Sequence, residues 1–469
     1  MSKNAGQPLL VSAPAGVGPP QYSPHPVSYQ AIYVPVRIDT QPVVCRRSPL
    51  SRFIVALLLA VGIYTILNAP RHWVHWDDRW DIPPASDMVL DQCVGVDSWA
   101  GSDAALSALD PAIPHSAGAS FEIPLDSGSV LLLTRYRRTH NFGQSPLFTG
   151  TLDVTTSARL NNTAIVTVES VRSTHNGNIK ACLVARNNGE RGVGIFTKGV
   201  WWAGHGDATS MQIRLVLPAA TTPLQLKGLI AYLPNFSLNI GKLKGAVDFK
   251  SVSLQTSNSA VHVKSLSAGE VTLHTSNGAI SVDTLLAPKL SLRTSNAGIS
   301  GTFNTSSSLI MTTSNAPINV RVGLESLDDA THPTTLAMRT SNHILTAKIS
   351  LAAPEGAPGA FRATAKTSNG PLTLAFPTFA AGGALDLSAR TSNAAAEVRL
   401  HPAYEGAFGV TTSRRYPAEV KRLHPSGDER QIEYQSGTAL RGYIFSDAEN
   451  KERGRVGVTT SNAPVRLFV

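Results

Sequence analysis

Thr256-Ser257-Asn258 is the first of eight Thr-Ser-Asn triplets in a chain of 469 residues. The others begin at Thr275, Thr294, Thr313, Thr340, Thr367, Thr391 and Thr460, and a degenerate copy, Thr412-Ser413-Arg414, lies between the last two. The first four copies are 19 residues apart, and the next three follow at intervals of 27, 27 and 24 residues. A short repeat of this kind predicts a solenoid in which each copy belongs to one structural unit.

Apolar and polar residues alternate on both sides of each triplet. Val252 and Leu254 precede the first copy, and Val261 and Val263 follow it. A period of two residues is typical of strands with one buried face, and Gly, Pro, Asn and Ser bound these runs. We therefore expect an all-β solenoid of stacked rungs over residues 219–469.

The Asn of each triplet stands where the rung must turn. Asn tolerates left-handed backbone angles, and its amide can hydrogen-bond within a turn. Stacking would place these amides above one another, so that each donates to the next and none is left unsatisfied. The predicted members of this Asn ladder are Asn258, Asn277, Asn296, Asn315, Asn342, Asn369, Asn393 and Asn462. The alternative is a ligand-binding stripe, although the triplet offers no acid, base or thiol.

Residues 1–52 are rich in Pro, Ser, Gln and Tyr and poor in large aliphatic side chains, a composition that predicts disorder. Within them Pro19, Pro20 and Tyr22 match the P-P-x-Y ligand of WW domains, which bind a polyproline helix. This motif predicts recruitment of a ubiquitin ligase; a plain solvated tail is the alternative.

Residues 53–69 form an uncharged, apolar run of 17 residues. As a helix it would span about 25 Å, close to the thickness of a thin bilayer. Arg46, Arg47 and Arg52 precede the run and Trp73 follows it, an arrangement that places the N-terminus in the cytosol. We predict a single-pass type II anchor in the secretory pathway or plasma membrane. A helix buried in a soluble core is the alternative.

The chain contains three cysteines and three glycosylation sequons. Cys45 adjoins the basic pair before the anchor and is a candidate for palmitoylation. Cys93 and Cys182 lie on the predicted luminal side, where they either pair or stay free. The sequons begin at Asn161, Asn235 and Asn304, all on the same predicted side.

Between the anchor and the repeats we expect a juxtamembrane stalk, residues 70–118, and a separate β domain, residues 119–218. In the stalk, His72 and His75 lack a second ligand pair, so a metal site is not favoured. Seven strands are predicted in the β domain, at 121–125, 130–136, 149–155, 164–169, 179–186, 192–198 and 211–217. This spacing indicates an antiparallel, sandwich-like cap that covers the first rung.

Two segments depart from these patterns. The loop 201–207 contains two Trp, a His and an Asp and could hold a sugar, although packing against a neighbour is favoured. Residues 415–451 are strongly charged, and we interpret them as an excursion hairpin with strands at 432–434 and 443–445. The chain would then return to complete a last rung at residues 460–462.

Charge and chemistry exclude several function classes. The net charge of +9 is thinly spread, and no basic cluster with interleaved aromatic residues suggests nucleic-acid binding. No catalytic, metal or cofactor signature is present. A polysaccharide-acting β-helix enzyme would need paired carboxylates or a metal on one face. The acids of the repeats, including Asp328 and Asp329, share no repeat position.

The Thr-Ser-Asn rungs, entered through Pro234-Asn235-Phe236-Ser237-Leu238, resemble the adhesin-like β-solenoid domain families of bacteria and fungi, whose function is largely unassigned. With its Pro-rich tail, short anchor and preceding β domain, the chain is similar to the membrane-anchored fungal-type members. The resemblance implies surface adhesion or scaffolding, with glycans or cell-surface proteins as partners, and supplies no catalytic residue. The alternatives are the polysaccharide-acting enzyme and a trafficking adaptor that recruits WW-domain proteins.

Overall fold

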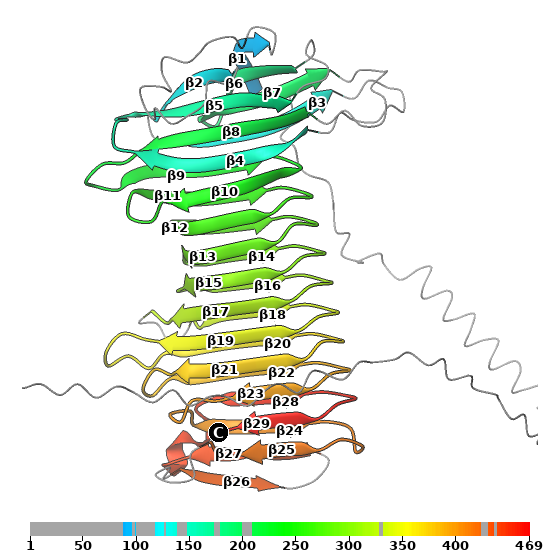
Figure 1. Ribbon diagram of the computed structural model, residues 1–469. Coiled ribbons are helices and arrows are strands. Elements are labelled where there is room, and N and C mark those ends of the chain that lie inside the picture. Colours follow the sequence, from blue (N-terminus) through cyan, green and yellow to red (C-terminus); the bar gives the residue numbers. More distant parts are fainter. Residues whose placement is uncertain are drawn as a thin grey trace, which may run out of the picture. The chain divides into compact units, whose positions relative to one another are not determined.

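A computed structural model describes the strands of the unit Asp81–Val469. The described residues are 88–95, 99, 118–125, 128–137, 148–172, 179–198, 209–327, 332–423, 430–435 and 439–469. They form a stack of strands with one short 3-10 helix, Ala448–Glu452, near its C-terminal end (Figure 1). Within these ranges, no helix has the length and hydrophobicity needed to span a bilayer. The predicted tail, the run 53–69 and most of the stalk lie outside them.

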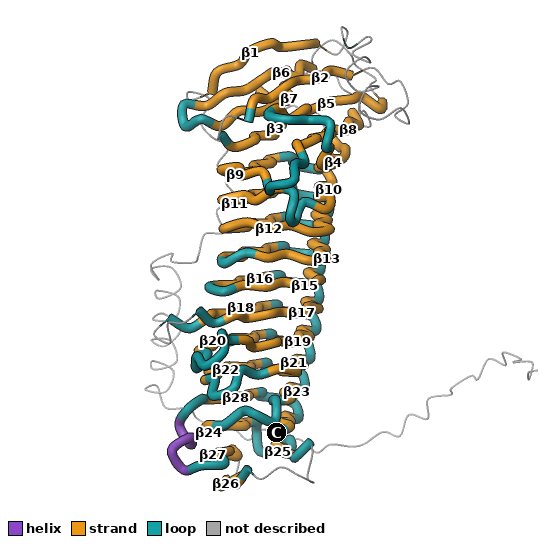
Figure 2. The backbone as a smooth tube through the Cα atoms, turned by 90° about the vertical axis from the view of Figure 1, so that its left-hand side faces the viewer, coloured by secondary structure: helices purple, strands orange, loops and turns teal. Residues whose placement is uncertain are grey.

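Each rung of the stack contributes one strand to each of two sheets, which we call sheet A and sheet B (Figure 2). Sheet A contains β9 (Leu224–Tyr232), β11 (Val247–Gln255), the second half of β12 (Val261–His274), β14 (Lys289–Arg293), β16 (Ser308–Thr312), β18 (Thr334–Arg339), β20 (Ala360–Lys366) and β22 (Ala384–Arg390). Sheet B contains β10 (Phe236–Lys242), the first half of β12, β13 (Ile280–Leu286), β15 (Ile299–Thr305), β17 (Ile318–Glu325), β19 (Leu345–Ala352), β21 (Leu372–Thr378) and β23 (Ala396–Arg399). All these pairs are parallel, and from β11 onward a triplet joins A to B in each rung.

The core lies between the two sheets. Val252 and Leu254 are almost fully buried, whereas Ser253 and Gln255 between and after them are partly exposed. The register places equivalent residues above one another, so that Val261 pairs with Ile280 and that residue with Ile299. The prediction of stacked strands with one buried face is confirmed, because a side chain buried in one rung finds the same apolar neighbours in the next.

The first strands continue the two sheets. The strands are β1 (Met88–Gly95), β2 (Gly118–Pro124), β3 (Ser129–Arg137), β4 (Phe148–Ser157), β5 (Thr163–Arg172), β6 (Ile179–Arg186), β7 (Glu190–Lys198) and β8 (Thr209–Pro218). Sheet A begins β1-β6-β7-β3-β9, and sheet B begins β2-β5-β8-β4-β10.

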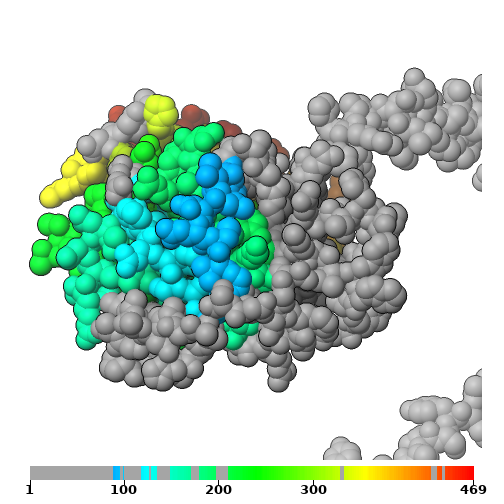
Figure 3. Space-filling model, turned by 90° about the horizontal axis from the view of Figure 1, so that it is seen from above, coloured from blue at the N-terminus to red at the C-terminus, as the bar shows by residue number. Residues whose placement is uncertain are grey.

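The expected antiparallel cap is therefore partly wrong. The outer pairs are antiparallel, but β3 and β4 pair in parallel with both of their neighbours. These two strands extend the rungs, so they must run in the direction of the rungs. The segment predicted as a stalk also contains the edge strand β1, most of which is exposed and shows no alternating pattern. Seen from above, β1 lies across the end of the stack (Figure 3).

The C-terminal end is closed by a rung inserted out of sequence order. The last two strands, β28 (Arg455–Thr459) and β29 (Val465–Phe468), do not form the final rung as the sequence predicts. β28 lies between β22 and β24 (Gly406–Thr411), and β29 lies between β23 and β25 (Ala418–Lys421). The chain thus skips one rung position, builds the rung beyond it and returns to fill the gap.

The charged excursion covers this last rung. β26 (Gln431–Gln435) and β27 (Ala439–Phe445) form the predicted antiparallel hairpin, and β27 pairs with β24 at the edge of sheet A. An antiparallel strand cannot extend a parallel stack in the same direction, so the hairpin ends sheet A and protects the edge that β24 would otherwise expose.

A buried carboxylate holds the excursion in place. Glu405 is 7% exposed, and its carboxylate accepts hydrogen bonds from the backbone N–H and hydroxyl of Ser446 and from Nη1 of Arg453 at 2.9 Å. Burial raises the pKa of Glu405, but the bonds from Ser446 and the charge of Arg453 outweigh it, so the pKa lies below its ordinary value. Nearby, buried Arg430 donates to the carbonyl of Tyr404 at 2.9 Å.

The longer repeats place their extra residues on one edge. Residues 353–359 and 379–383 each connect a strand of sheet B to the next strand of sheet A. The triplets connect A to B, so the extra loops lie on the edge opposite the triplets. The regular edge is therefore free to stack without interruption.

Candidate functional site

The Thr of each triplet faces inward and ties one corner to the next. The Thr275 hydroxyl donates to the carbonyl of Ser259 at 3.0 Å, and Thr294 does the same to Gly278. Both side chains are at most 2% exposed. The same bond recurs at Thr313, Thr340, Thr367, Thr391 and Thr460. A buried hydroxyl and a carbonyl of the corner are satisfied together in each rung.

The Asn side chains form the predicted ladder. Nδ2 of each Asn donates to Oδ1 of the Asn one rung earlier, at 2.6–2.8 Å from Asn277 onward. The ladder runs in the order Asn235, Asn258, Asn277, Asn296, Asn315, Asn342, Asn369, Asn393 and Asn462. Because Asn462 stacks directly on Asn393, 69 positions earlier in the sequence, the ladder continues without a gap.

Backbone conformation does not explain the choice of Asn. Among the described residues, the only non-glycine positions with positive φ are Gln92 and Asn235. The triplet Asn residues therefore do not adopt left-handed angles, contrary to the sequence interpretation. Asn is needed because its amide is both donor and acceptor, so that identical side chains can bond to one another.

Both ends of the ladder differ from the triplet. Asn235, predicted only as a glycosylation candidate, accepts from Asn258 and starts the ladder with a φ of 65°. Its position 23 residues before Asn258 and the alternating residues after it were the available signals. At the other end, the degenerate Thr412-Ser413-Arg414 lies on the outer side of the last triplet, where Thr412 donates to the carbonyl of Ala463. Among the described residues no rung stacks beyond this one, so an Asn at position 414 would have no Asn of a further rung to bond to.

A row of basic side chains runs beside the ladder on the outer face of sheet A. The residues just before the eight triplet Thr residues form this row: the register aligns Gln255, His274, Arg293, Thr312, Arg339, Lys366, Arg390 and Thr459 in successive rungs. We call His274, Arg293, Arg339, Lys366 and Arg390 the basic strip. Successive rungs are about 4.8 Å apart, so the last three members present three charges in three consecutive rungs.

The last three members of the basic strip have few acidic neighbours on their own sheet. Arg339, Lys366 and Arg390 are exposed, and within the part of the chain that the structure describes none of them forms an ion pair. On β18, β20, β22 and β28 the outward charged side chains are Arg339, Arg362, Lys366, Arg390 and Arg455 against a single acid, Asp386. Asp386 already pairs with Arg362 at 3.3 Å.

The outer face of sheet B has a different charge pattern. Near its C-terminal end Arg399 pairs with Glu397 and Lys421 pairs with Glu419, both at 2.8 Å. Arg466 lies 3.5 Å from the same Glu419. The two faces therefore differ near this end of the stack, since Arg399, Lys421 and Arg466 have acidic neighbours, whereas Arg339, Lys366 and Arg390 form no ion pair among the described residues.

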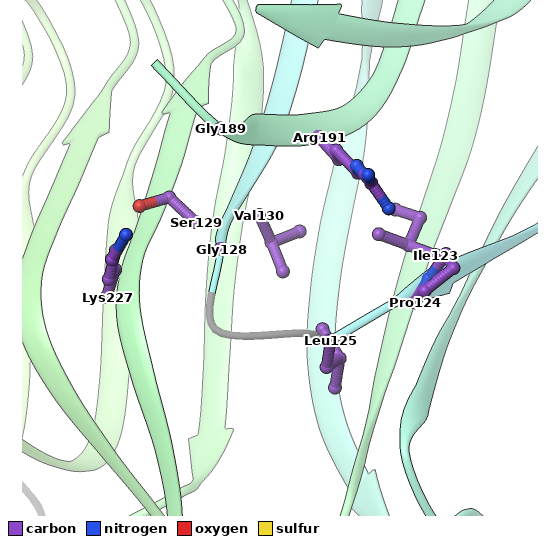
Figure 4. Close-up of a pocket in the computed structure, with 9 residues that line it drawn as sticks. All are labelled: Ile123, Pro124, Leu125, Gly128, Ser129, Val130, Gly189, Arg191 and Lys227. Atoms are coloured by element: carbon purple, nitrogen blue, oxygen red, sulfur yellow. The ribbon is translucent and has the colours of Figure 1, made fainter.

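The first strands contain a small pocket of about 160 Å³ (Figure 4). Arg191 of β7 and Lys227 of β9 lie on opposite sides of it, and Ser129 and Val130 of β3 line the wall between them. Two cations and one hydroxyl could receive a small anion, but the pocket lacks an acid or base pair for catalysis.

The predicted disulfide cysteines and two of the predicted glycosylation sites lie in different parts of the stack. Cys93 and Cys182 form a disulfide that joins β1 to β6. Asn161 is exposed in the turn after β4, whereas Asn304 lies partly buried within β15 on sheet B. The two cysteines and Asn161 belong to the first strands, and Asn304 lies on sheet B whereas the basic strip lies on sheet A, so these residues do not form one site with it.

Several predicted features fall outside the described residues. They are Pro19, Pro20, Tyr22 and Cys45, the pair His72 and His75, the loop 201–207, and the acids Asp328 and Asp329. Among the residues that are described, no group of three His, Cys, Asp or Glu side chains is arranged to hold a metal ion.

Comparison with known proteins adds little. No protein-family model matches the chain, and no curated protein matches it. One match among solved structures is described as a "putative cell adhesion protein" from Clostridium sporogenes ATCC 15579, with 7% identity, a TM-score of 0.16, and coverage of 76% of this chain and 99% of that chain. A likeness this weak carries no argument, so function must be argued from the stack itself.

Proposed function

We propose that this chain is a non-enzymatic scaffold that presents a long β-solenoid for adhesion or ligand binding. The observation that carries the proposal is how the triplets use their polar groups. Thr hydroxyls and Asn amides bond to the neighbouring rung throughout the ladder. The most frequent polar motif of the chain therefore serves stacking, and the chemistry left for function lies on the outer faces of the sheets.

The outer faces suit repeated weak contacts better than a single reaction centre. On sheet A, for example, Arg339, Lys366 and Arg390 place a cation at the same position of three consecutive rungs. A ligand that spans several rungs would meet a regular series of contacts, and linked contacts raise overall affinity without any one being strong. Adhesion to a repetitive surface or polymer makes use of this property.

The disulfide between Cys93 and Cys182 supports display in an oxidising compartment. We propose the orientation expected from the sequence: the run 53–69 as a type II anchor, with the stack in the secretory lumen or outside the cell. Glycans at Asn161, Asn235 and Asn304 belong to the same proposal. The ladder uses only Oδ1 of Asn235, so a sugar on its nitrogen would leave the bond from Asn258 intact.

Protease protection and glycosidase treatment of the full-length chain in membranes test the orientation. We expect a protected stack whose apparent mass falls on deglycosylation. Cells that display the chain should then bind to glycan-coated or cell-coated surfaces more strongly than cells that display a version lacking residues 247–469. A stack digested without detergent would overturn the orientation, and equal binding by both chains would overturn the adhesive function.

A further inference from the structure

We propose that the basic strip on sheet A binds a linear acidic polysaccharide, with successive charged sugars lying along successive rungs. This inference deepens the proposed function by naming the partner class and the face that binds it. It rests on three observations: the alignment of Arg339, Lys366 and Arg390, the absence of an ion pair to any of these three among the described residues, and the small side chains beside them.

The alignment follows from the solenoid itself. Arg339 pairs in register with Lys366, and Lys366 with Arg390, so their side chains rise from one line parallel to the stack axis. Like charges in adjacent rungs repel one another, and an anionic ligand would remove this repulsion. In the last rungs of sheet B, by contrast, Glu397 pairs with Arg399 and Glu419 pairs with Lys421, so the neutralisation there comes from the protein itself.

The neighbouring row of sheet A leaves room for a ligand to approach. Ala337, Thr364, Ser388 and Gly457 occupy the next outward positions in β18, β20, β22 and β28. These side chains are short, so a chain lying across them can reach the longer basic side chains at its margin. On the far side of the basic strip stand the exposed Asn ladder and its Ser residues, which can hydrogen-bond to sugar hydroxyls.

The spacing distinguishes between polymers. The rungs repeat at about 4.8 Å, which is comparable to the length of one pyranose ring with its linkage. An extended acidic peptide places side chains on one face about every 6.7 Å, and a strand of duplex DNA places a phosphate about every 3.4 Å. Single-stranded nucleic acid is bound mainly by stacking on aromatic side chains, and β18, β20 and β22 carry no Trp, Tyr or His and no outward Phe beside Arg339, Lys366 and Arg390.

The test uses the purified full-length chain in detergent, with binding measured by biolayer interferometry. The probes are sodium polygalacturonate, heparin, neutral dextran and a DNA duplex at two salt concentrations. The strip variant is Arg339→Gln/Lys366→Gln/Arg390→Gln. The matched control is Lys264→Gln/Arg321→Gln/Lys348→Gln, which removes the same charge from exposed positions on sheet B.

We expect wild type to bind at least one acidic polysaccharide, and the comparison of the first two probes shows whether carboxylate or sulfate is preferred. The strip variant should weaken this binding at least tenfold and reduce its salt dependence, while the control changes it less than twofold. Equal losses in both variants, no binding to either acidic probe, or tighter binding to DNA would overturn the inference. If the strip variant still supports adhesion of displaying cells, the adhesive function stands and only the partner is wrong.

Discussion

The middle of the stack and its C-terminal closure hold each rung to its neighbour in different ways. In the middle, each rung repeats the contacts of the one before: an inward Thr, an Asn in the ladder and aligned apolar residues. At the closure, a rung is inserted out of order and fixed by contacts that occur only once, such as Glu405 with Arg453. In the repeated rungs the stability comes from many similar, individually weak contacts, whereas at the closure it depends on a few side chains that each occur once. The predictions below test that contrast, from the largest effect to the smallest.

Removal of residues 454–469 should have the largest effect. It deletes β28 and β29, which separate β22 from β24 and β23 from β25. We expect the amides of β24 and β25 to exchange like those of an unfolded segment in hydrogen-exchange mass spectrometry. The amides of residues 261–325 should stay protected, because rungs contact only their neighbours.

A synthetic peptide of residues 454–469, added to the truncated chain, should restore protection of residues 406–421 by filling the gap. If β24 and β25 stay protected in the truncated chain without peptide, the outer rung can pair directly with β22 and β23. The inserted rung would then not be required for the stability of this end.

Loss of the Glu405 carboxylate should have the next largest effect. Glu405→Gln removes the charge that pairs with Arg453 and weakens both bonds from Ser446. Hydrogen bonds to charged groups contribute about 1.5–3 kcal/mol each, and Arg453 is partly exposed, so we expect a local loss of about 3 kcal/mol. Hydrogen exchange of β24 and β27 measures it, and unchanged exchange would contradict it.

The pH dependence of this difference is set by the lowered pKa of Glu405. A depressed folded-state pKa adds stability that is complete above the unfolded pKa of about 4.3. The advantage of wild type over Glu405→Gln should therefore be full at pH 6 and shrink as the pH falls through the folded pKa. An advantage of the same size at pH 6 and at pH 3 would show that Glu405 acts through packing and not through its charge.

A buried Thr in the middle of the stack should matter less. Thr294→Val keeps the shape but removes the hydroxyl that donates to the Gly278 carbonyl at 3.0 Å. An unsatisfied buried acceptor costs about 1–3 kcal/mol, so we expect a loss near 2 kcal/mol, confined to residues 275–312. Ser295→Ala is the matched control in the same corner and should change exchange very little. Equal effects of the two substitutions would argue against a role for the hydroxyl.

The same contrast explains what could be predicted from the sequence. The rungs that repeat in the structure also repeat in the sequence, so the triplets, the alternating strands and the ladder from Asn258 to Asn462 were predictable. The inserted rung was not, because the triplet at residues 460–462 fits equally well after or before residues 412–414. The pattern of a strand identifies its buried face and not its neighbour, which is also why the parallel pairing of β3 and β4 was missed.

The basic strip was missed for another reason. Its members are spread over 117 positions, from 274 to 390, and contribute little to any local cluster. The signal was the residue before each triplet, as in Arg293-Thr294 and Lys366-Thr367, and it becomes a surface only once the rungs are placed in register. Position within the repeat, more than local charge density, indicates where a solenoid gathers charge.

The smallest effect is expected for Asn→Ala substitutions in the ladder, and its size should depend only on whether the Asn lies inside the ladder or at its end. Asn296 donates to Asn277 and accepts from Asn315, whereas Asn462 donates to Asn393 and accepts from no other Asn. These bonds are exposed, so each contributes at the low end of about 0.5–1.5 kcal/mol. Asn296→Ala should lose about 1 kcal/mol and Asn462→Ala about half as much, measured by local exchange. If the end residue costs as much as the interior one, the stack does not share its stability equally among identical bonds, and the distinction between repeated and single contacts would have to be abandoned.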